Sequence, residues 1–251
     1  MDPVIKIENV SKSFGKKKVL NGTSLEVKKG ESLVIIGQSG CGKSVLLKHL
    51  NRLMRPDFGA VYIGGKDVAP MKSEELSDLR KKIGMLFQSA ALLDSLSVAD
   101  NVGLGLKEGW KYSRGEIADI VEQKLEMVGL PGTGNLMPSD LSGGMRKRVG
   151  LARAIATNPE ILLYDEPTTG LDPITSDMIN DLMINLREKL DVTSIAVTHD
   201  MTSAYKIADR IVMLYEGKVE FEGTPEDVRH SSNAVVDQFI NGRAAGPIQA
   251  V

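Results

Sequence analysis

Short apolar runs alternate with stretches of helical periodicity along most of this chain. The runs are rich in Val, Ile and Leu and are bounded by Gly, Asp or Lys, which is typical of buried strands. They predict strands at residues 4–10, 23–27, 33–36, 61–63, 83–87, 161–164, 194–197, 211–214 and 219–221. Strands that alternate with helices imply a mostly parallel sheet covered on both faces. The last two runs flank Glu216-Gly217, which predicts a hairpin.

Between these runs, apolar residues recur every three or four positions. The clearest case is 117–128, where Ile117, Ile120, Val121, Leu125 and Val128 form one face of an amphipathic helix. Further helices are predicted at 45–53, 73–82, 97–102, 143–157, 178–186, 203–208 and 235–240. Residues 89–157 hold helices only and lie between two predicted strands, so we interpret them as a helical subdomain inserted into an α/β core.

A glycine-rich segment follows the strand predicted at 33–36 and opens a helix. Its sequence is Gly37-Gln38-Ser39-Gly40-Cys41-Gly42-Lys43-Ser44, followed by Val45, and it fits the P-loop pattern. The glycines let successive N–H groups point inward at phosphate oxygens, and the helix adds the positive end of its dipole. Lys43 can reach the β- and γ-phosphates, and the Ser44 hydroxyl can ligate Mg²⁺. We therefore expect an ATP site here rather than a glycine turn that matches by chance.

Two carboxylates, Asp165 and Glu166, follow the very apolar strand predicted at 161–164. An acid at the carboxyl end of a buried strand can hold Mg²⁺ beside a P-loop. Glu166 is then placed to polarise an attacking water. Alternatively, the two acids open a helix at Pro167.

Two further features point to phosphate. Ser142, Gly143 and Gly144 begin a helix and make a second anion-binding terminus, which one nucleotide in one chain does not need. The economical explanation is that this terminus faces a nucleotide held by another copy. His199, one of three histidines, follows a strand and is a candidate sensor of the γ-phosphate, although such a histidine is more often structural.

Composition narrows the class of protein. The chain has 251 residues, 42% of them hydrophobic, and a formal net charge of −2, which argues against nucleic acid as a partner bound through bulk charge. Cys41 is the one cysteine, so an internal disulfide and a cysteine metal site are excluded. We find no signal-peptide pattern and no apolar run long enough to cross a bilayer, and we expect a soluble, cytosolic chain.

In this order the motifs resemble those of ATP-binding cassette (ABC) ATPases, the nucleotide-binding subunits of ABC transporters, over about residues 4–223. Phe14 matches the aromatic A-loop, 37–44 Walker A, Gln88 the Q-loop, 142–145 the signature, 161–166 Walker B, Asp172 the D-loop and His199 the H-loop. The resemblance implies an α/β fold with a P-loop NTPase (RecA-like) core, an N-terminal antiparallel β subdomain and an inserted α-helical subdomain. We expect the ATPase domain to span 1–230, with its helical insertion at about 89–157, and a helical and extended tail to span 231–251.

The resemblance also implies a head-to-tail homodimer with ATP sandwiched between the copies, where Ser142, Gly143, Gly144 and Asp172 of one chain meet the nucleotide of the other. Glu166 would be the general base, His199 would hold the γ-phosphate, and Gln88 and Asp165 would serve Mg²⁺ together with Ser44. One departure concerns the last signature position, which is usually Gln and is Met145 here. Its effect on hydrolysis stays open.

Residues 86–102, 136–145, 172–175 and 238–242 resemble the Mla-type phospholipid transporters, which work with an integral-membrane permease and a lipid-binding MCE-domain protein. The chain would then be peripheral on the cytoplasmic face of the inner membrane. An amino-acid importer, a lipoprotein-releasing system and, from another class, a soluble ABC ATPase of translation or DNA repair remain alternatives. Cargo, direction of transport, the permease and a role of the tail in dimer stability stay open.

Overall fold

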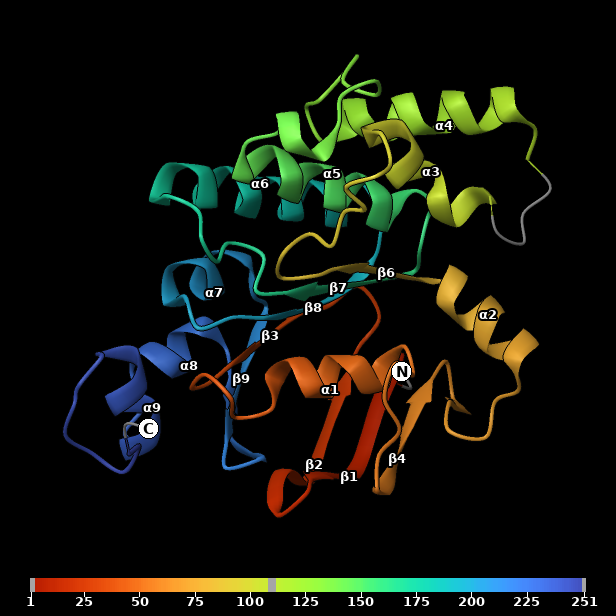
Figure 1. Ribbon diagram of the computed structural model, residues 1–251. Helices are drawn as coiled ribbons and strands as arrows, with labels where there is room; N and C mark the ends of the chain where they lie inside the picture. Colours follow the sequence, from red (N-terminus) through yellow and green to blue (C-terminus); the bar gives the residue numbers. More distant parts are fainter. Residues whose placement is uncertain (1–2, 108–111, 250–251) are drawn as a thin grey trace. The chain divides into compact units, whose positions relative to one another are not determined.

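The computed structural model describes residues 3–107 and 112–249, which form two units (Figure 1). The first unit combines residues 1–76 with 195–251, and the second comprises residues 77–194. Helix α2 (Ser73–Lys81) and strand β8 (Thr193–Val197) cross the division between them. Each unit is described by itself.

The first unit contains an antiparallel sheet at the N-terminus. Its strands are β1 (Ile5–Phe14), β2 (Lys17–Val27), β4 (Phe58–Ile63) and β5 (Lys66–Asp67), in the order β2-β1-β4-β5. Ile5 lies opposite Val27 on one side and Ile63 on the other, so alternate apolar residues share one buried face. β1 and β2 are longer than the sequence predicted, and Phe14 ends β1 instead of lying in a turn.

The same unit holds the strand that leads into the P-loop. β3 (Ser32–Ile36) pairs in parallel with β9 (Arg210–Tyr215), which forms a hairpin with β10 (Lys218–Gly223). Every residue of β3 is buried, as expected for a strand covered on both faces. The predicted turn at Glu216-Gly217 is confirmed, with both residues in the left-handed region that such hairpins favour. The unit's remaining helices are α1 (Lys43–Leu50), α7 (Met201–Ile207), α8 (Pro225–Arg229) and α9 (Ala234–Ile240).

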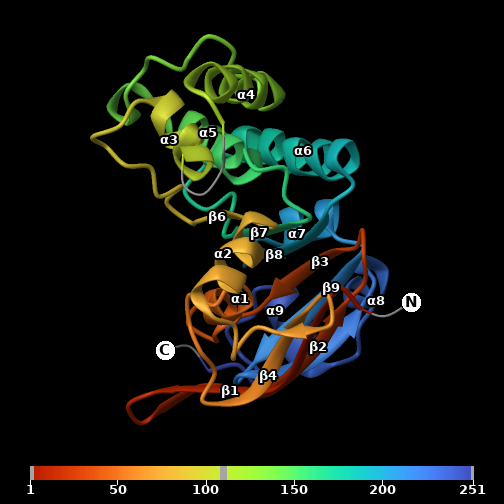
Figure 2. The same ribbon diagram turned by 90° about the vertical axis from the view of Figure 1, so that its right-hand side faces the viewer.

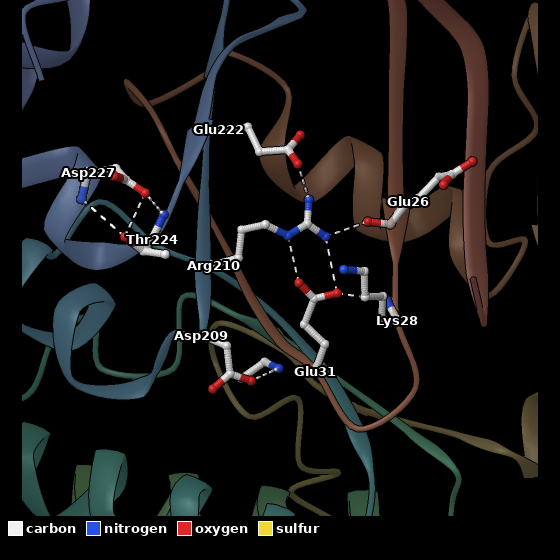
Figure 3. Close-up of polar contacts among 9 residues, drawn as sticks. Glu26, Lys28, Glu31, Asp209, Arg210, Glu222, Thr224 and Asp227 are labelled. Carbon is white, nitrogen blue, oxygen red and sulfur yellow. Dashed lines mark hydrogen bonds and ion pairs between the residues drawn. The ribbon is translucent and has the colours of Figure 1, made fainter. Parts of the chain in front are cut away.

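An ionic cluster around Arg210 fixes the start of β3 and β9 (Figure 3). The guanidinium donates to the Glu31 carboxylate at 2.6 and 3.1 Å, to the Glu26 carbonyl at 2.6 Å and to the Glu222 carboxylate. These contacts join the turn before β3 to β10, at the end of β3 opposite the P-loop. Glu31 holds the pKa of the guanidinium above its ordinary value.

The second unit carries the predicted helical insertion, in which α3 (Val98–Lys107), α4 (Arg114–Met127) and α5 (Gly143–Ile155) pack together (Figure 2). The unit also contains the parallel strands β6 (Ile83–Leu86) and β7 (Ile161–Asp165). Helix α6 (Pro173–Leu190) and a 3-10 turn at Pro138–Asp140 belong to it as well. α4 begins before the predicted apolar face because Ser113 and Glu116 form a capping box.

The C-terminal segment packs against its own chain. The buried Gln238 of α9 donates to the carbonyls of Arg243 and Ile248 at 3.1 and 3.0 Å and accepts from Ile248 N–H at 2.6 Å. Residues 244–248 are consecutive bends in place of the extended run expected there, and residues 250–251 lie outside the described residues. The side chain of Gln238 is the reason, because it closes the segment into a loop.

Candidate functional site

The P-loop leaves β3 at Gly37 and enters α1 at Lys43. Gly37, Gly40 and Gly42 have φ values of 148°, 77° and 109°, so the loop depends on backbone conformations that favour glycine. A Cβ at Gly37 would lie 2.3 Å from the Leu214 carbonyl oxygen, and one at Gly42 would lie 2.9 Å from the Val19 carbonyl oxygen. Gly37 and Gly42 are therefore required by shape as well as by conformation, and Gly40 by conformation alone. The segment forms the tight curl that a phosphate cradle needs.

Lys43 is buried, and its ammonium donates to the carbonyl oxygens of Gly37 at 2.7 Å and Gln38 at 3.2 Å. The lysine thus closes the loop from inside and places its charge where phosphates would be held. Ser44 and Val45 follow in the first turn of α1, both half-buried, and Ser39 and Gly40 are exposed.

A pocket of 450 Å³ lies beside the P-loop. It is lined by Gln38, Ser39, Gly40 and Cys41 and by residues of β2 and of the β9–β10 turn. The C-terminal segment reaches the same place, because Gln38 donates to the Gln249 carbonyl at 3.2 Å and Tyr215 donates to the Pro247 carbonyl at 3.0 Å. Sequence analysis missed these contacts, since they join the C-terminal segment to residues far away in the sequence and depend on how that segment folds.

Phe14 and His199 also belong to the first unit. Phe14 is 47% exposed, so its ring is accessible for stacking, and the Lys12 ammonium lies over the ring at 6.0 Å from the centroid. His199 is exposed and follows β8. The Thr198 N–H before it donates to the Ile35 carbonyl at 3.1 Å, which ties the start of the His199 loop to β3.

In the second unit, Asp165 ends β7 and Glu166 follows it, both buried. Glu166 has a φ of 50°, a left-handed conformation that is strained for this residue type. Its carboxylate accepts a hydrogen bond from the Thr169 hydroxyl at 2.9 Å. Asp165 therefore has the extended backbone of a strand, whereas Glu166 is left-handed and its carboxylate is oriented by Thr169.

Lys147 of α5 lies against the same place. Its side chain is buried, and its ammonium donates to the Gln88 carbonyl at 2.5 Å and to the Glu166 carbonyl at 2.9 Å. Burial lowers the pKa of the Lys147 ammonium, and the charges of Glu166 and Asp165 act in the opposite direction. The sequence analysis did not predict a role for Lys147, because this residue does not belong to the apolar face predicted for its helix.

The signature residues and Asp172 meet at a pocket of 290 Å³ in the second unit, where Ser142, Gly143 and Gly144 line one part and Asp172 another. Ser142 caps α5 through its hydroxyl, and the Asp172 carboxylate caps α6 by accepting from Ile174 and Thr175 N–H, both at 3.0 Å. The Asp172 carboxylate also accepts from the Thr175 hydroxyl, and this hydrogen bond, followed by the backbone ones, lowers the pKa of Asp172. Two motifs far apart in sequence therefore line a common surface hollow.

The predicted site residues form two sets, one in each unit. Gly37–Val45 lies with Phe14 and His199 in the first unit, whereas Gln88, Asp165, Glu166, the signature and Asp172 belong to the second. Within the described residues, no cluster of His, Cys, Asp and Glu is arranged to bind a metal by itself. No helix in those residues combines the length and apolar character that a membrane crossing requires.

Comparison with known proteins identifies the family of this chain. The model of the family described as ABC transporter matches residues 20–169. The chain is 41% identical to the intermembrane phospholipid transport system ATP-binding protein MlaF of Haemophilus influenzae, over 98% of this chain and 93% of that protein. It is 43% identical to the methionine import ATP-binding protein MetN of Carboxydothermus hydrogenoformans, over 95% of this chain and 72% of that protein.

A solved structure is also similar. It is an ATP-binding cassette, described as dimeric, in a post-hydrolysis state and bound to ADP and Pi. The match has a TM-score of 0.81 and 36% identity, and it covers 88% of this chain and 98% of that one. The α/β P-loop core, the N-terminal antiparallel sheet and the helical insertion are those of this fold, as the sequence predicted.

Proposed function

Because this chain belongs to the ABC transporter family and is an ATP-hydrolysing subunit of such a transporter, we propose that two copies assemble head to tail and drive a permease that moves phospholipid between membranes. The observation that carries the dimer is the hollow lined by Ser142, Gly143 and Gly144. It offers a helix N-terminus and a hydroxyl to an anion, although the P-loop already provides a phosphate cradle. A nucleotide bound between two copies would contact the P-loop of one copy and the hollow of the other.

Within each site, the residues of this chain bind and orient. The P-loop amides and Lys43 hold the phosphates, and Phe14 stacks on the base. Ser44, Gln88 and Asp165 offer hydroxyl, amide and carboxylate oxygens, a donor set that suits Mg²⁺, which usually binds through one or two carboxylates and substrate phosphates. When bound, the metal would neutralise charge on the phosphates.

Glu166 is the proposed general base. The Thr169 hydroxyl and the strained backbone hold its carboxylate in one orientation, and positioning is most of what phosphoryl transfer requires of a protein. His199 would contact the γ-phosphate from the first unit. Asp172 would stabilise the surface of the hollow through its cap on α6, and its Oδ1 and Oδ2 are already engaged there.

We expect Glu166→Gln to lower kcat for ATP by roughly 10²- to 10⁴-fold, because general-base catalysis contributes about that much. Binding of ATP should persist, so the variant should trap ATP in a stable dimer. The measurement is steady-state hydrolysis together with size-exclusion chromatography in MgATP. A matched control is Glu160→Gln, an exposed carboxylate of the same unit that pairs with Lys82 at 2.9 Å. Hydrolysis by Glu166→Gln at the wild-type rate would falsify the assignment.

Phospholipid is the favoured cargo for two reasons. MlaF matches this chain over nearly its whole length. Met145 in the signature and the ending at residues 238–242, where Gln238 organises the tail, also fit the Mla branch. The second candidate is import of methionine or another amino acid, which is favoured by the 43% identity to MetN.

The partners would be integral-membrane permease subunits and an MCE-domain lipid-binding protein, with this chain peripheral on the cytoplasmic face of the inner membrane. The ATPase domain would span residues 1–230, with the helical insertion at about 89–157, and the tail would span 231–251. The test is a pull-down of the tagged chain from native membranes in detergent. A permease that co-purifies with an MCE-domain protein and phospholipid supports the proposal. A permease with an amino-acid-binding protein supports the second candidate instead, and recovery of the chain alone contradicts both.

A further inference from the structure

Given the proposed role of Glu166 as general base, we infer that Lys147 is a positioning residue for hydrolysis. Its ammonium ties the loop that begins at Gln88 to the backbone of Glu166, so that the two segments keep one geometry. Gln88 and Glu166 each lie two residues beyond Leu86 and Tyr164, which are paired in β6 and β7, and Lys147 of helix α5 links the two segments after this pairing ends.

The contacts of Lys147 are specific. The ammonium donates to the Gln88 carbonyl at 2.5 Å and to the Glu166 carbonyl at 2.9 Å, and the residue is only 5% exposed. A charged donor gives stronger hydrogen bonds than a neutral one, and a buried one is not weakened by competing water. One side chain therefore holds two segments that are distant in sequence.

Both carbonyls lie where the backbone needs support. Glu166 is left-handed, with φ 50°, and its carbonyl also accepts a hydrogen bond from the Thr169 N–H at the longer distance of 3.4 Å. After Gln88 the chain passes through Ala90 and Ala91, which are also left-handed, with φ 60° and 49°. Strained conformations of this kind persist only when surrounding contacts determine them.

A second residue of α5 supports the same loop. Arg153 donates to the Ala91 carbonyl at 2.6 Å and to the Ala90 carbonyl. Helix α5 thus holds the Gln88 loop at two points, through Lys147 and Arg153, and Lys147 also reaches the Glu166 backbone. Lys147 is consequently the residue whose loss should disturb the general base.

Replacement of Lys147 should therefore lower kcat and leave KM unchanged. A general base must be held within a fraction of an ångström of its productive position, so a displaced Glu166 slows the chemical step. The P-loop belongs to the other unit and makes its own contacts through Lys43. Nucleotide binding should therefore be preserved when Lys147 is replaced.

The competing explanation is that Lys147 serves stability alone. Lys124 of α4 provides the matched control, because it is equally buried in the same unit and donates to Asn158 Oδ1 at 2.6 Å. Burial also lowers the pKa of the Lys124 ammonium. The two lysines share length, burial and charge, but only Lys147 contacts the Gln88 and Glu166 carbonyls.

The experiment compares Lys147→Met, Lys147→Arg and Lys124→Met in the full-length protein, with kcat and KM for ATP, the Kd of MgATP and thermal unfolding as measurements. We expect Lys147→Met to lower kcat by roughly 10- to 100-fold with KM and Kd within about twofold of wild type. Lys147→Arg should recover part of kcat, since a guanidinium can still donate to both carbonyls. Lys124→Met should lose a similar amount of thermal stability and keep the wild-type kcat.

A wild-type kcat in Lys147→Met overturns the inference, as does an equal loss in Lys124→Met. If Lys147→Met does not fold, Lys147→Gln decides: its shorter, neutral amide should give reduced kcat at unchanged KM, and a wild-type kcat again overturns the inference. Glu166→Gln is measured alongside. If that variant hydrolyses ATP normally, the proposed general base fails independently of Lys147. If it is inactive while Lys147→Met is active, only the positioning role fails.

Discussion

Tyr164 carries an unusual polar group just before the Walker B acids. Its side chain is 1% exposed, and among the residues that the structure describes its hydroxyl has no hydrogen-bond partner. Burial raises the pKa of that hydroxyl far above its ordinary value. Tyr164→Phe removes the hydroxyl and keeps the ring, so we expect the variant to be more stable than the wild type.

The magnitude follows from the desolvation of the hydroxyl. A buried polar group without a partner costs about 1–3 kcal/mol. The small void left by its oxygen offsets a few tenths of a kcal/mol. The net gain should be about 1 kcal/mol, which for a chain of this size raises Tm by roughly 2–4 °C.

The assay is scanning calorimetry of the purified chain. Tyr215→Phe is the control, since the same atom is removed from a hydroxyl that donates to the Pro247 carbonyl at 3.0 Å. Losing that exposed bond should lower stability by about 0.5 kcal/mol. The two variants should thus shift Tm in opposite directions. A lower Tm in Tyr164→Phe would refute the reasoning, because it would mean that the hydroxyl is hydrogen-bonded.

Two further predictions concern the first unit. Arg210→Met leaves Glu31, the less exposed member of its ion pair, without its cation, and should cost about 2–3 kcal/mol by chemical denaturation; a change below about 0.5 kcal/mol would show that the cluster in Figure 3 is not stabilising. Burial of His49, whose Nδ1 lies 2.7 Å from the Val45 carbonyl, lowers its pKa below the ordinary value of 6.5. The unfolded chain then takes up a proton at higher pH than the folded chain, so stability present above about pH 6.5 falls as pH decreases toward the folded-state pKa. His49→Leu should reduce the loss of unfolding free energy between about pH 7 and about pH 5, and an unchanged slope would contradict this.

Local chemistry explains which features the sequence could predict. The apolar runs predicted strands β3 and β7 correctly, because strands buried on both faces are continuously hydrophobic. The P-loop was predictable because its glycines, Lys43 and Ser44 are contiguous, so their geometry depends on neighbours in the chain. Short elements such as α8 escaped prediction, since five residues do not establish a period.

Contacts between distant segments are what only the tertiary structure decided. The hollow shared by Asp172 and the signature, the approach of Gln249 to Gln38 and the two carbonyls held by Lys147 all join residues that no periodicity connects. The left-handed backbone of Glu166 could likewise not be predicted from the sequence, because glutamate has no preference for that conformation. The sequence determined which side chains are available and which short segments fold. Packing and strand register determined which atoms meet, because they set the positions of residues far apart in the chain.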